Sequence, residues 1–157
     1  MSAVLGSLIA VLGTLLGSFS TYVFQQRTAA RTEASARAER LRLEHLAACS
    51  GFAAAVTELK RAVVTAWLRR SDPVELGLAL AEADRLGALA ETARVRLQLV
   101  SGQPEPLADT AFARLDALRG AVDVTELKSH EAEFAAALAA FITAAAERLS
   151  ASHRAVP

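Results

Sequence analysis

The hydrophobic and polar positions divide the chain into an uncharged opening segment and a series of amphipathic helices. No residue from Ala3 to Phe24 is charged, and a helix of that length can cross a hydrocarbon core of roughly 30 Å. A helix satisfies its own backbone hydrogen bonds inside lipid, and a run rich in Leu, Val and Ile transfers there favourably from water. We therefore predict a transmembrane helix over residues 1–25.

The helical pattern continues beyond this segment to Arg70. No Pro lies between residues 25 and 70, and the one Gly there, Gly51, costs only about 1 kcal/mol in a helix. A basic juxtamembrane stalk helix is predicted over residues 26–45 and a helical bundle over residues 46–151. A line of mainly apolar residues at spacings of three and four, called the seam, suits a coiled-coil stalk. From Cys49 onward a second line of apolar residues lies beside the seam and makes the apolar face wide enough for packing in a bundle. The seam consists of Ala34, Ala38, Leu41, His45, Ala48, Phe52, Ala55 and Leu59.

A second helix has clear signals at both ends. Asp72 is placed as its N-cap, Pro73 occupies its first position, and Glu75 could complete a capping box. The helix continues to about Val100, after which Gly102 can adopt the left-handed cap conformation. Its predicted inner face is Leu76, Leu80, Ala83, Leu86, Ala90, Ala93, Leu97 and Val100.

Two further helices are predicted, one over about 106–119 and one opened by Asp123 and Glu126 as a capping box. Short connections make helices that follow one another antiparallel neighbours. The predicted fold is therefore all-α: a single N-terminal transmembrane helix that continues into a long stalk helix, then an antiparallel bundle of four helices, or of three if the last two merge. Residues 152–157 form a frayed tail. The apolar stripes are Leu107, Ala111, Leu115 and Leu118, then Leu127, His130, Phe134, Leu138, Phe141, Ala145 and Leu149.

Small residues recur along one face of the predicted span. Glycine is common in membrane helices, and one Gly-x-x-x-Gly alone is weak evidence for an interface. Five positions in register, at spacings of four, three, four and three, favour a face on which another helix packs closely. Its partner is a second copy of the chain or another membrane protein. The face consists of Gly6, Ala10, Gly13, Gly17 and Ser20.

The formal net charge of zero hides a division along the chain. Residues 27–70 carry nine basic and four acidic side chains, whereas residues 71–157 carry eight and thirteen. Five of the basic residues follow the predicted span, and none precedes it, so the C-terminal part is expected in the cytoplasm and the N-terminus outside. A cleaved signal peptide would carry a positive charge before its apolar core. The five are Arg27, Arg31, Arg37, Arg40 and Arg42.

The basic segment has two interpretations. It determines topology without binding anything, or it also contacts phosphate groups, most simply those of anionic lipid headgroups. Nucleic acid is disfavoured as a partner, because Glu33, Glu39 and Glu44 alternate with the arginines and can pair with them along the helix.

Few residues point to chemistry. His45 and Cys49 share a helix face, but a metal needs three or four ligands and the chain has no second cysteine. His130, with Glu126 four residues earlier, is expected to be a partly buried core residue, and Trp67 is likewise expected in the core. We therefore predict no enzymatic activity, no cofactor and no metal.

The opening IAVLGTLLGSFSTYVFQQR and the later run ERLRLEHLAACSGFAAAVTELKRAV resemble the small KilB-like membrane proteins of actinobacterial chromosomes and conjugative plasmids, especially those of Streptomyces. This resemblance is drawn mainly on the first 70 residues. It implies a non-enzymatic membrane protein connected with plasmid transfer or with spread of the plasmid through the mycelium.

Three functions remain open from the sequence. The first is an anchored, self-associating helical adaptor in the cytoplasmic membrane. The second is a phage-type lysis accessory of the spanin kind, which requires the domain outside the cell and conflicts with the placement of the arginines. The third is an enzyme or metal-binding helical bundle.

Overall fold

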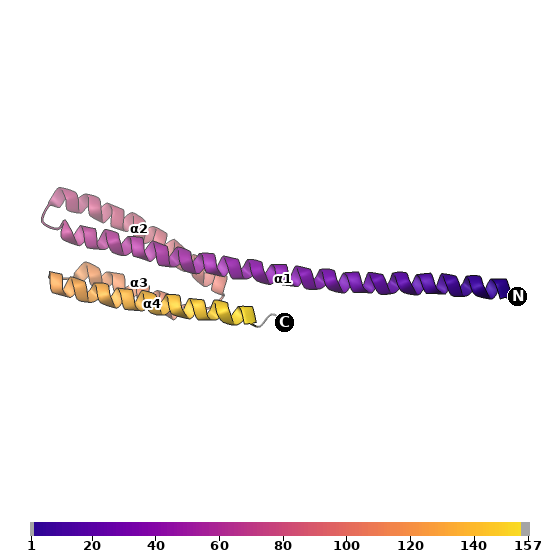
Figure 1. Ribbon diagram of the computed structural model, residues 1–157. Helices are drawn as coiled ribbons and strands as arrows, with labels where there is room; N and C mark the ends of the chain where they lie inside the picture. The colour runs from indigo at the N-terminus through magenta and orange to yellow at the C-terminus, as the bar shows by residue number, and fades with distance from the viewer. Residues whose placement is uncertain (1, 155–157) are drawn as a thin grey trace. The chain divides into compact units, whose positions relative to one another are not determined.

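The structure, a computed structural model, describes the backbone of residues 2–154 and the side chains of residues 33–151. This part of the chain is all-helical and has no strand. The four helices are α1 (Ser2–Leu68), α2 (Pro73–Ser101), α3 (Pro106–Gly120) and α4 (Val124–Arg154) (Figure 1). The last two helices do not merge, and α4 runs past residue 151 into the predicted tail.

The chain divides into two compact units, Met1–Leu41 and Arg42–Pro157. From Ser2 on, the first unit is helical backbone of α1, and every side chain from residue 33 to residue 41 is exposed. The second unit, called the domain below, holds the end of α1 together with α2, α3 and α4. The helix α1 continues without a break, as the sequence predicted, because no proline interrupts it.

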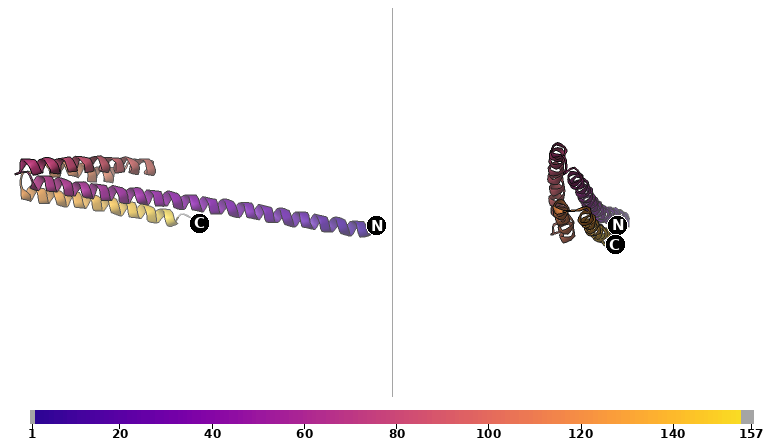
Figure 2. Two further views of the ribbon diagram at one scale, coloured as in Figure 1. Left: turned by 90° about the horizontal axis from the view of Figure 1, so that it is seen from above. Right: turned by 90° about the vertical axis from the view of Figure 1, so that its left-hand side faces the viewer.

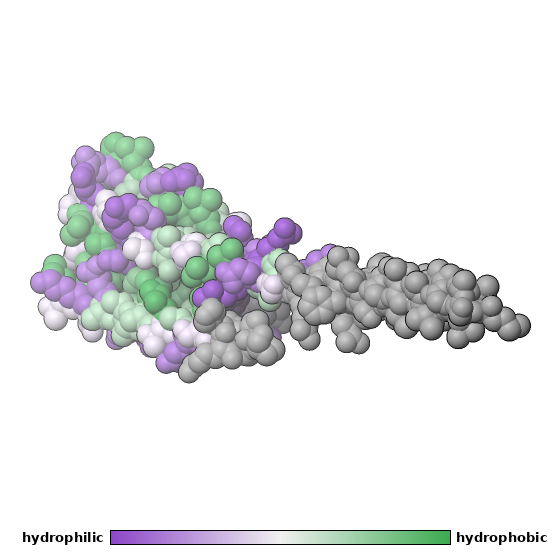
Figure 3. Space-filling model, turned by 45° about the vertical axis from the view of Figure 1, so that its right-hand side comes forward, coloured by the Kyte–Doolittle hydropathy of each residue, from purple (hydrophilic) through white to green (hydrophobic). Residues whose placement is uncertain are grey.

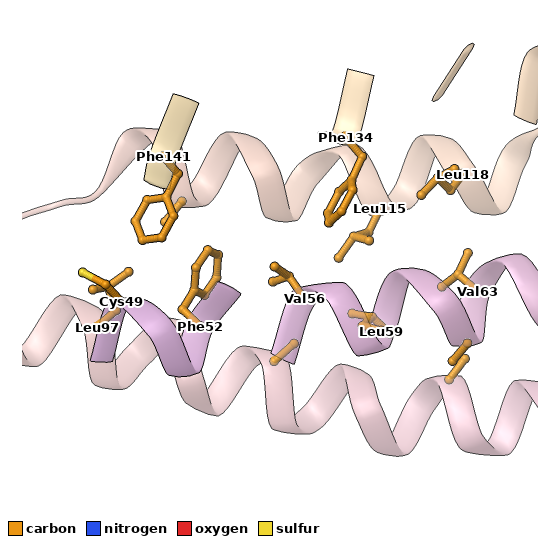
Figure 4. Close-up of a cluster of buried hydrophobic side chains, with 14 of the residues drawn as sticks. Cys49, Phe52, Val56, Leu59, Val63, Leu97, Leu115, Leu118, Phe134 and Phe141 are labelled. Atoms are coloured by element: carbon orange, nitrogen blue, oxygen red, sulfur yellow. The ribbon is translucent and has the colours of Figure 1, made fainter. Parts of the chain in front are cut away.

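Within the domain, α2 turns back along the end of α1, and α3 and α4 run side by side (Figures 1 and 2). One buried cluster draws side chains from all four helices. At its centre the rings of Phe52 and Phe141 meet edge to face with centroids 5.2 Å apart (Figure 4), a geometry that aromatic pairs prefer. The largest fully buried side chains are Phe52, Phe141, Leu59, Leu97, Leu118 and Val56.

Local signals set the helix ends. The Asp72 carboxylate accepts two backbone N–H groups in the first turn of α2, as predicted. Glu75 does not complete the capping box, because it forms an ion pair with Arg69. At the other end of α2, Gly102 has a φ of 64° and its N–H donates to the Gln98 carbonyl at 3.0 Å. This left-handed cap is the one that glycine allows.

The start of α4 differs slightly from the predicted capping box. The Asp123 carboxylate accepts the Glu126 N–H at 2.8 Å, as expected. The Glu126 carboxylate, however, accepts the N–H of Val122, one residue earlier than the N-cap. The Glu126 N–H, one of the four that a helix start leaves without a partner inside the helix, is thus satisfied by Asp123.

The structure corrects the predicted seam of α1. Ala48, Phe52 and Leu59 are buried in the core of the domain itself, so they are not available to a second copy. Ala34, Ala38 and Leu41 are exposed. Any coiled coil between copies would therefore involve residues before Ala48.

The predicted stripes agree with the structure on α4 and over most of α2. On α4, Leu127, Phe134, Phe141 and Ala145 are buried. On α2, Ala83, Ala90 and Leu97 are buried, and Leu86 and Ala93 pack half-buried against the core. The prediction is wrong at Leu80 and Val100, which are exposed. On α3, Leu107 is likewise exposed, and Ala108 takes its place in the core.

Among the residues whose side chains are described, Val124–Ala151 is long and apolar enough to cross a membrane by length and composition. Large apolar residues of this helix face the core, and much of its hydropathy comes from exposed alanines. On the face shown in Figure 3, apolar and hydrophilic residues are intermixed. The predicted span Ala3–Phe24 lies outside the described side chains and stays a prediction. The exposed alanines are Ala132, Ala135, Ala136, Ala139, Ala140, Ala146 and Ala151.

Candidate functional site

The predicted helix–helix face of the span lies in the helical backbone of α1, where a spacing of three and four residues keeps positions on one side. Its members are Gly6, Ala10, Gly13, Gly17 and Ser20, and their side chains lie outside the described residues, as do those of Arg27 and Arg31. The predicted interface and this part of the basic segment therefore stay predictions.

The described part of the basic segment carries both signs of charge on an exposed helix. Arg37 and Arg40 are exposed and Arg42 is half-buried. Glu39 and Glu44 are exposed between and beside them. Apolar side chains follow in the same stretch, since Leu41, Leu43 and Leu46 are all exposed. Residues 33–46 thus carry three arginines and three glutamates, and Leu43 and Leu46 are apolar area that the domain leaves exposed.

An ion pair between buried Glu105 and partly exposed Arg148 holds α4 to the start of α3. Glu105 is 2 % exposed, and both of its carboxylate oxygens accept from the Arg148 guanidinium, at 2.7 and 2.8 Å. This two-bond geometry is the strongest form of an arginine–carboxylate pair. The hydrogen bond to Glu105 raises the pKa of Arg148. Sequence reasoning missed this ion pair, because the two residues lie far apart in the chain.

Cys49 lies beside this pair in the core. Burial raises the pKa of its thiol, and the positive charge of Arg148 opposes that effect only in part. The side chain is thus a neutral thiol at neutral pH, and thiols in this state react slowly. His45, its predicted neighbour on the helix, is half-buried. Across the described residues no group of three His, Cys, Asp or Glu side chains could hold a metal.

His130 lies at the junction of α3 and α4 among acidic residues. Its ring nitrogens are 3.6 Å from Glu126 and 3.9 Å from Glu133, longer than hydrogen bonds. Glu133 also pairs with Arg114 of α3 at 2.8 Å. The Arg114–Glu133 pair joins the two helices, and His130 lies partly buried beside it, as predicted.

Trp67 packs against the core from the end of α1. Its indole N–H donates to the carbonyl of Ala121 at 2.7 Å, which ties α1 to the connection between α3 and α4. The guanidinium of Arg70 lies 3.6 Å from the centre of its ring, within cation–π range. Trp67 also lines a surface hollow of about 320 Å³, which sequence reasoning did not find.

The domain formed by these residues matches a known family. A model of the KilB plasmid transfer protein family covers residues 46–149, about two thirds of the chain. The chain belongs to this family. The KilB match begins at residue 46, so it covers the helical domain and excludes the opening segment on which much of the sequence resemblance was drawn. No curated protein and no solved structure matches the chain.

Some of the candidate sites lie inside the residues that match the KilB family, and others lie before them. The Glu105–Arg148 pair, Cys49, His130 and Trp67 all lie inside the matched residues. The predicted helix–helix face and the basic segment lie before them. The family therefore describes the domain, and the membrane-associated features need their own tests.

Proposed function

We propose that this chain is a single-pass protein of the cytoplasmic membrane that acts as a non-enzymatic adaptor in plasmid transfer or spread. In this topology the N-terminus lies outside the cell, Ala3–Phe24 spans the membrane, and the helical domain lies in the cytoplasm. The observation that carries the proposal is the match of residues 46–149 to the KilB plasmid transfer family, in a chain whose residues 3–24 form an uncharged segment of spanning length.

Charge placement supports the membrane part of the proposal. Arg27, Arg31, Arg37, Arg40 and Arg42 follow the uncharged segment. Arginines next to a span are retained on the cytoplasmic side, and each is attracted to anionic headgroups by about 1 kcal/mol. The lipid bilayer is accordingly one partner of the chain.

The packing of the domain supports an adaptor. Its charged groups serve largely to join helices: Lys60 of α1 pairs with Glu131 of α4 at 2.9 Å, and Arg94 of α2 with Asp109 of α3 at 2.8 Å. Such ion pairs between helices suit a rigid antiparallel four-helix bundle. The surface of such a bundle can bind partner proteins without catalysing a reaction.

Topology is tested with reporters fused to each end of the full chain. An alkaline phosphatase fusion at the C-terminus is expected to be inactive and a green fluorescent protein fusion there to be bright. A control variant with Arg27, Arg31 and Arg37 changed to Gln weakens the retention signal and is expected to give a mixed orientation. An active C-terminal phosphatase in the unchanged chain would place the domain outside and favour a spanin-like role.

Self-association is tested at the predicted face of the span. Gly13→Ile together with Gly17→Ile adds bulk where another helix would approach closely, so cross-linked oligomers in membranes are expected to decrease severalfold. Leu8→Ile with Leu15→Ile is the matched control, because these positions lie on the opposite side of the helix. Equal cross-linking of the two variants would rule this face out.

A further inference from the structure

The hollow beside Trp67 lies at the end of the domain where α1 passes into α2 and α3 into α4 (Figure 1). Its walls are mainly apolar and come from α1, α2 and the connection after α3. Leu80, 48 % exposed, belongs to these walls, which explains why an apolar position of α2 is not buried. A volume of about 320 Å³ and an apolar, aromatic lining are typical of small-molecule sites.

Two arginines and one aspartate stand in this lining. Arg70 stacks on the indole of Trp67 and Arg119 comes from the end of α3. The nearest carboxylate to Arg119 within the described residues is that of Asp116 at 3.8 Å, beyond hydrogen-bond range. Asp84 lies on the opposite wall, on α2. With two guanidinium groups and one carboxylate, the hollow carries a net positive charge.

A second hollow of about 330 Å³ adjoins the first and shares Asp84 and Arg119 with it. It adds the carboxylates of Glu91 and Asp116, so its charge is negative. An anion would be repelled there, so of the two hollows the first, which Arg70 and Arg119 line, is the one that suits an anion.

We propose that the hollow beside Trp67 binds a small amphipathic organic acid. The apolar body of the ligand lies against Trp67 and Leu80, and its carboxylate faces Arg70 and Arg119. Arginine is suited to this task because its planar guanidinium donates two hydrogen bonds to a carboxylate. The site goes beyond the adaptor function, since ligand binding at the end of the domain does not depend on the membrane segment.

The test uses three probes with one apolar body: 4-phenylbutyrate, 4-phenylbutanol and 4-phenylbutylamine. Trp67 is the sole tryptophan of the chain, so 5-fluorotryptophan labelling gives one fluorine signal, and it comes from the hollow. The labelled full chain in lipid nanodiscs is titrated with each probe and followed by fluorine NMR. A saturable shift is expected, with 4-phenylbutyrate binding about fivefold more tightly than the alcohol and the amine binding most weakly.

Two charge variants are expected to act in opposite directions. Arg119→Gln is expected to weaken the binding of 4-phenylbutyrate about fivefold and to leave the binding of 4-phenylbutanol unchanged, because it removes a charged donor and little apolar area. Asp84→Asn is expected to strengthen the binding of 4-phenylbutyrate about twofold, because it removes a negative charge that repels the carboxylate of the probe. Arg114→Gln is the control, since Arg114 lies on the same helix as Arg119 and pairs with Glu133 outside the hollow.

Opposite changes in the two variants, with an unchanged control, support the proposal, because a general loss of structure would weaken all probes together. Circular dichroism of each variant verifies its helical content. The absence of a saturable shift with any probe would overturn the proposal and leave the hollow as a contact surface for another protein. Equal binding of the three probes, or equal effects of Arg119→Gln and Arg114→Gln, would overturn the recognition of the carboxylate.

Discussion

Gly51 and Gly102 show how the same residue type has opposite roles at two positions. Gly51 lies within α1, is exposed, and a Cβ atom added there would meet nothing within 4 Å. Gly102 ends α2 with a φ of 64°, a conformation that L side chains rarely adopt. The first glycine therefore weakens its helix, and the second is required by its turn.

Gly51→Ala is expected to stabilise the domain by about 1 kcal/mol, because alanine loses less backbone entropy than glycine in a helix. Gly102→Ala is the matched control and is expected to destabilise it by about 1 kcal/mol, because the left-handed conformation strains a Cβ atom. Urea unfolding, followed by the fluorescence of Trp67, measures both. Destabilisation by Gly51→Ala would show that the open side of α1 contacts another molecule in solution.

At the scale of single residues, the local sequence predicted most of the helix ends correctly. Asp72, Asp123 and Gly102 were identified correctly because a cap depends on a few neighbouring residues. The role of Glu75 was predicted wrongly, because Arg69 comes within reach of it only after the chain has turned between α1 and α2. A local pattern contains no information about such a competing partner.

At the scale of elements, α4 is held to the domain by two different contacts. Phe134 and Phe141 enter the core, and Arg148 pairs with buried Glu105. The aromatic contacts follow from the apolar stripe of α4. The ion pair joins residues 43 positions apart and has no periodic signal, so sequence reasoning could not find it. The inner face of α2 was predicted at Ala83, Ala90 and Leu97, but the exposure of Leu80 and Val100 was not, because it depends on which helices pack against α2.

Arg148→Met is expected to cost about 2 kcal/mol of unfolding free energy. It leaves the Glu105 carboxylate buried without its charged partner, a change that costs about 3–5 kcal/mol for fully buried pairs. The Arg148 side chain is 46 % exposed, so water reaches the site and reduces the cost. Urea denaturation of the full chain in nanodiscs measures the change.

The double variant Glu105→Met with Arg148→Met is its control. Both charges are removed, and Glu105 provides no side-chain hydrogen bond to cap α3, so the free energy of unfolding is expected to return to within about 1 kcal/mol of the original. A double variant as unstable as the single one would show that Arg148 stabilises α4 through its aliphatic stem rather than through the ion pair.

At the scale of the whole molecule, the described core is made by the domain alone. The buried cluster begins at Ala48, and the described side chains from residue 33 to residue 41 are exposed. The number and type of helices could be predicted because periodicity and helix caps recur throughout the chain. The point where α1 leaves its exposed stretch and enters a core could not, because the same three-and-four spacing continues across it.

A fragment of residues 42–157 is therefore expected to fold without the predicted membrane segment. It should be helical, remain soluble without detergent, and unfold in urea within about 0.5 kcal/mol of the full chain, as distant parts of a protein usually contribute independently. A shorter fragment, residues 53–157, lacks Phe52 and the ring contact with Phe141. Its free energy of unfolding is expected to fall by more than about 3–5 kcal/mol, the usual effect of truncating one buried phenylalanine, because buried Ala48 and Cys49 are lost as well. Aggregation of the longer fragment would mean that residues before Arg42 cover apolar surface of the domain, and the two units would then fold as one.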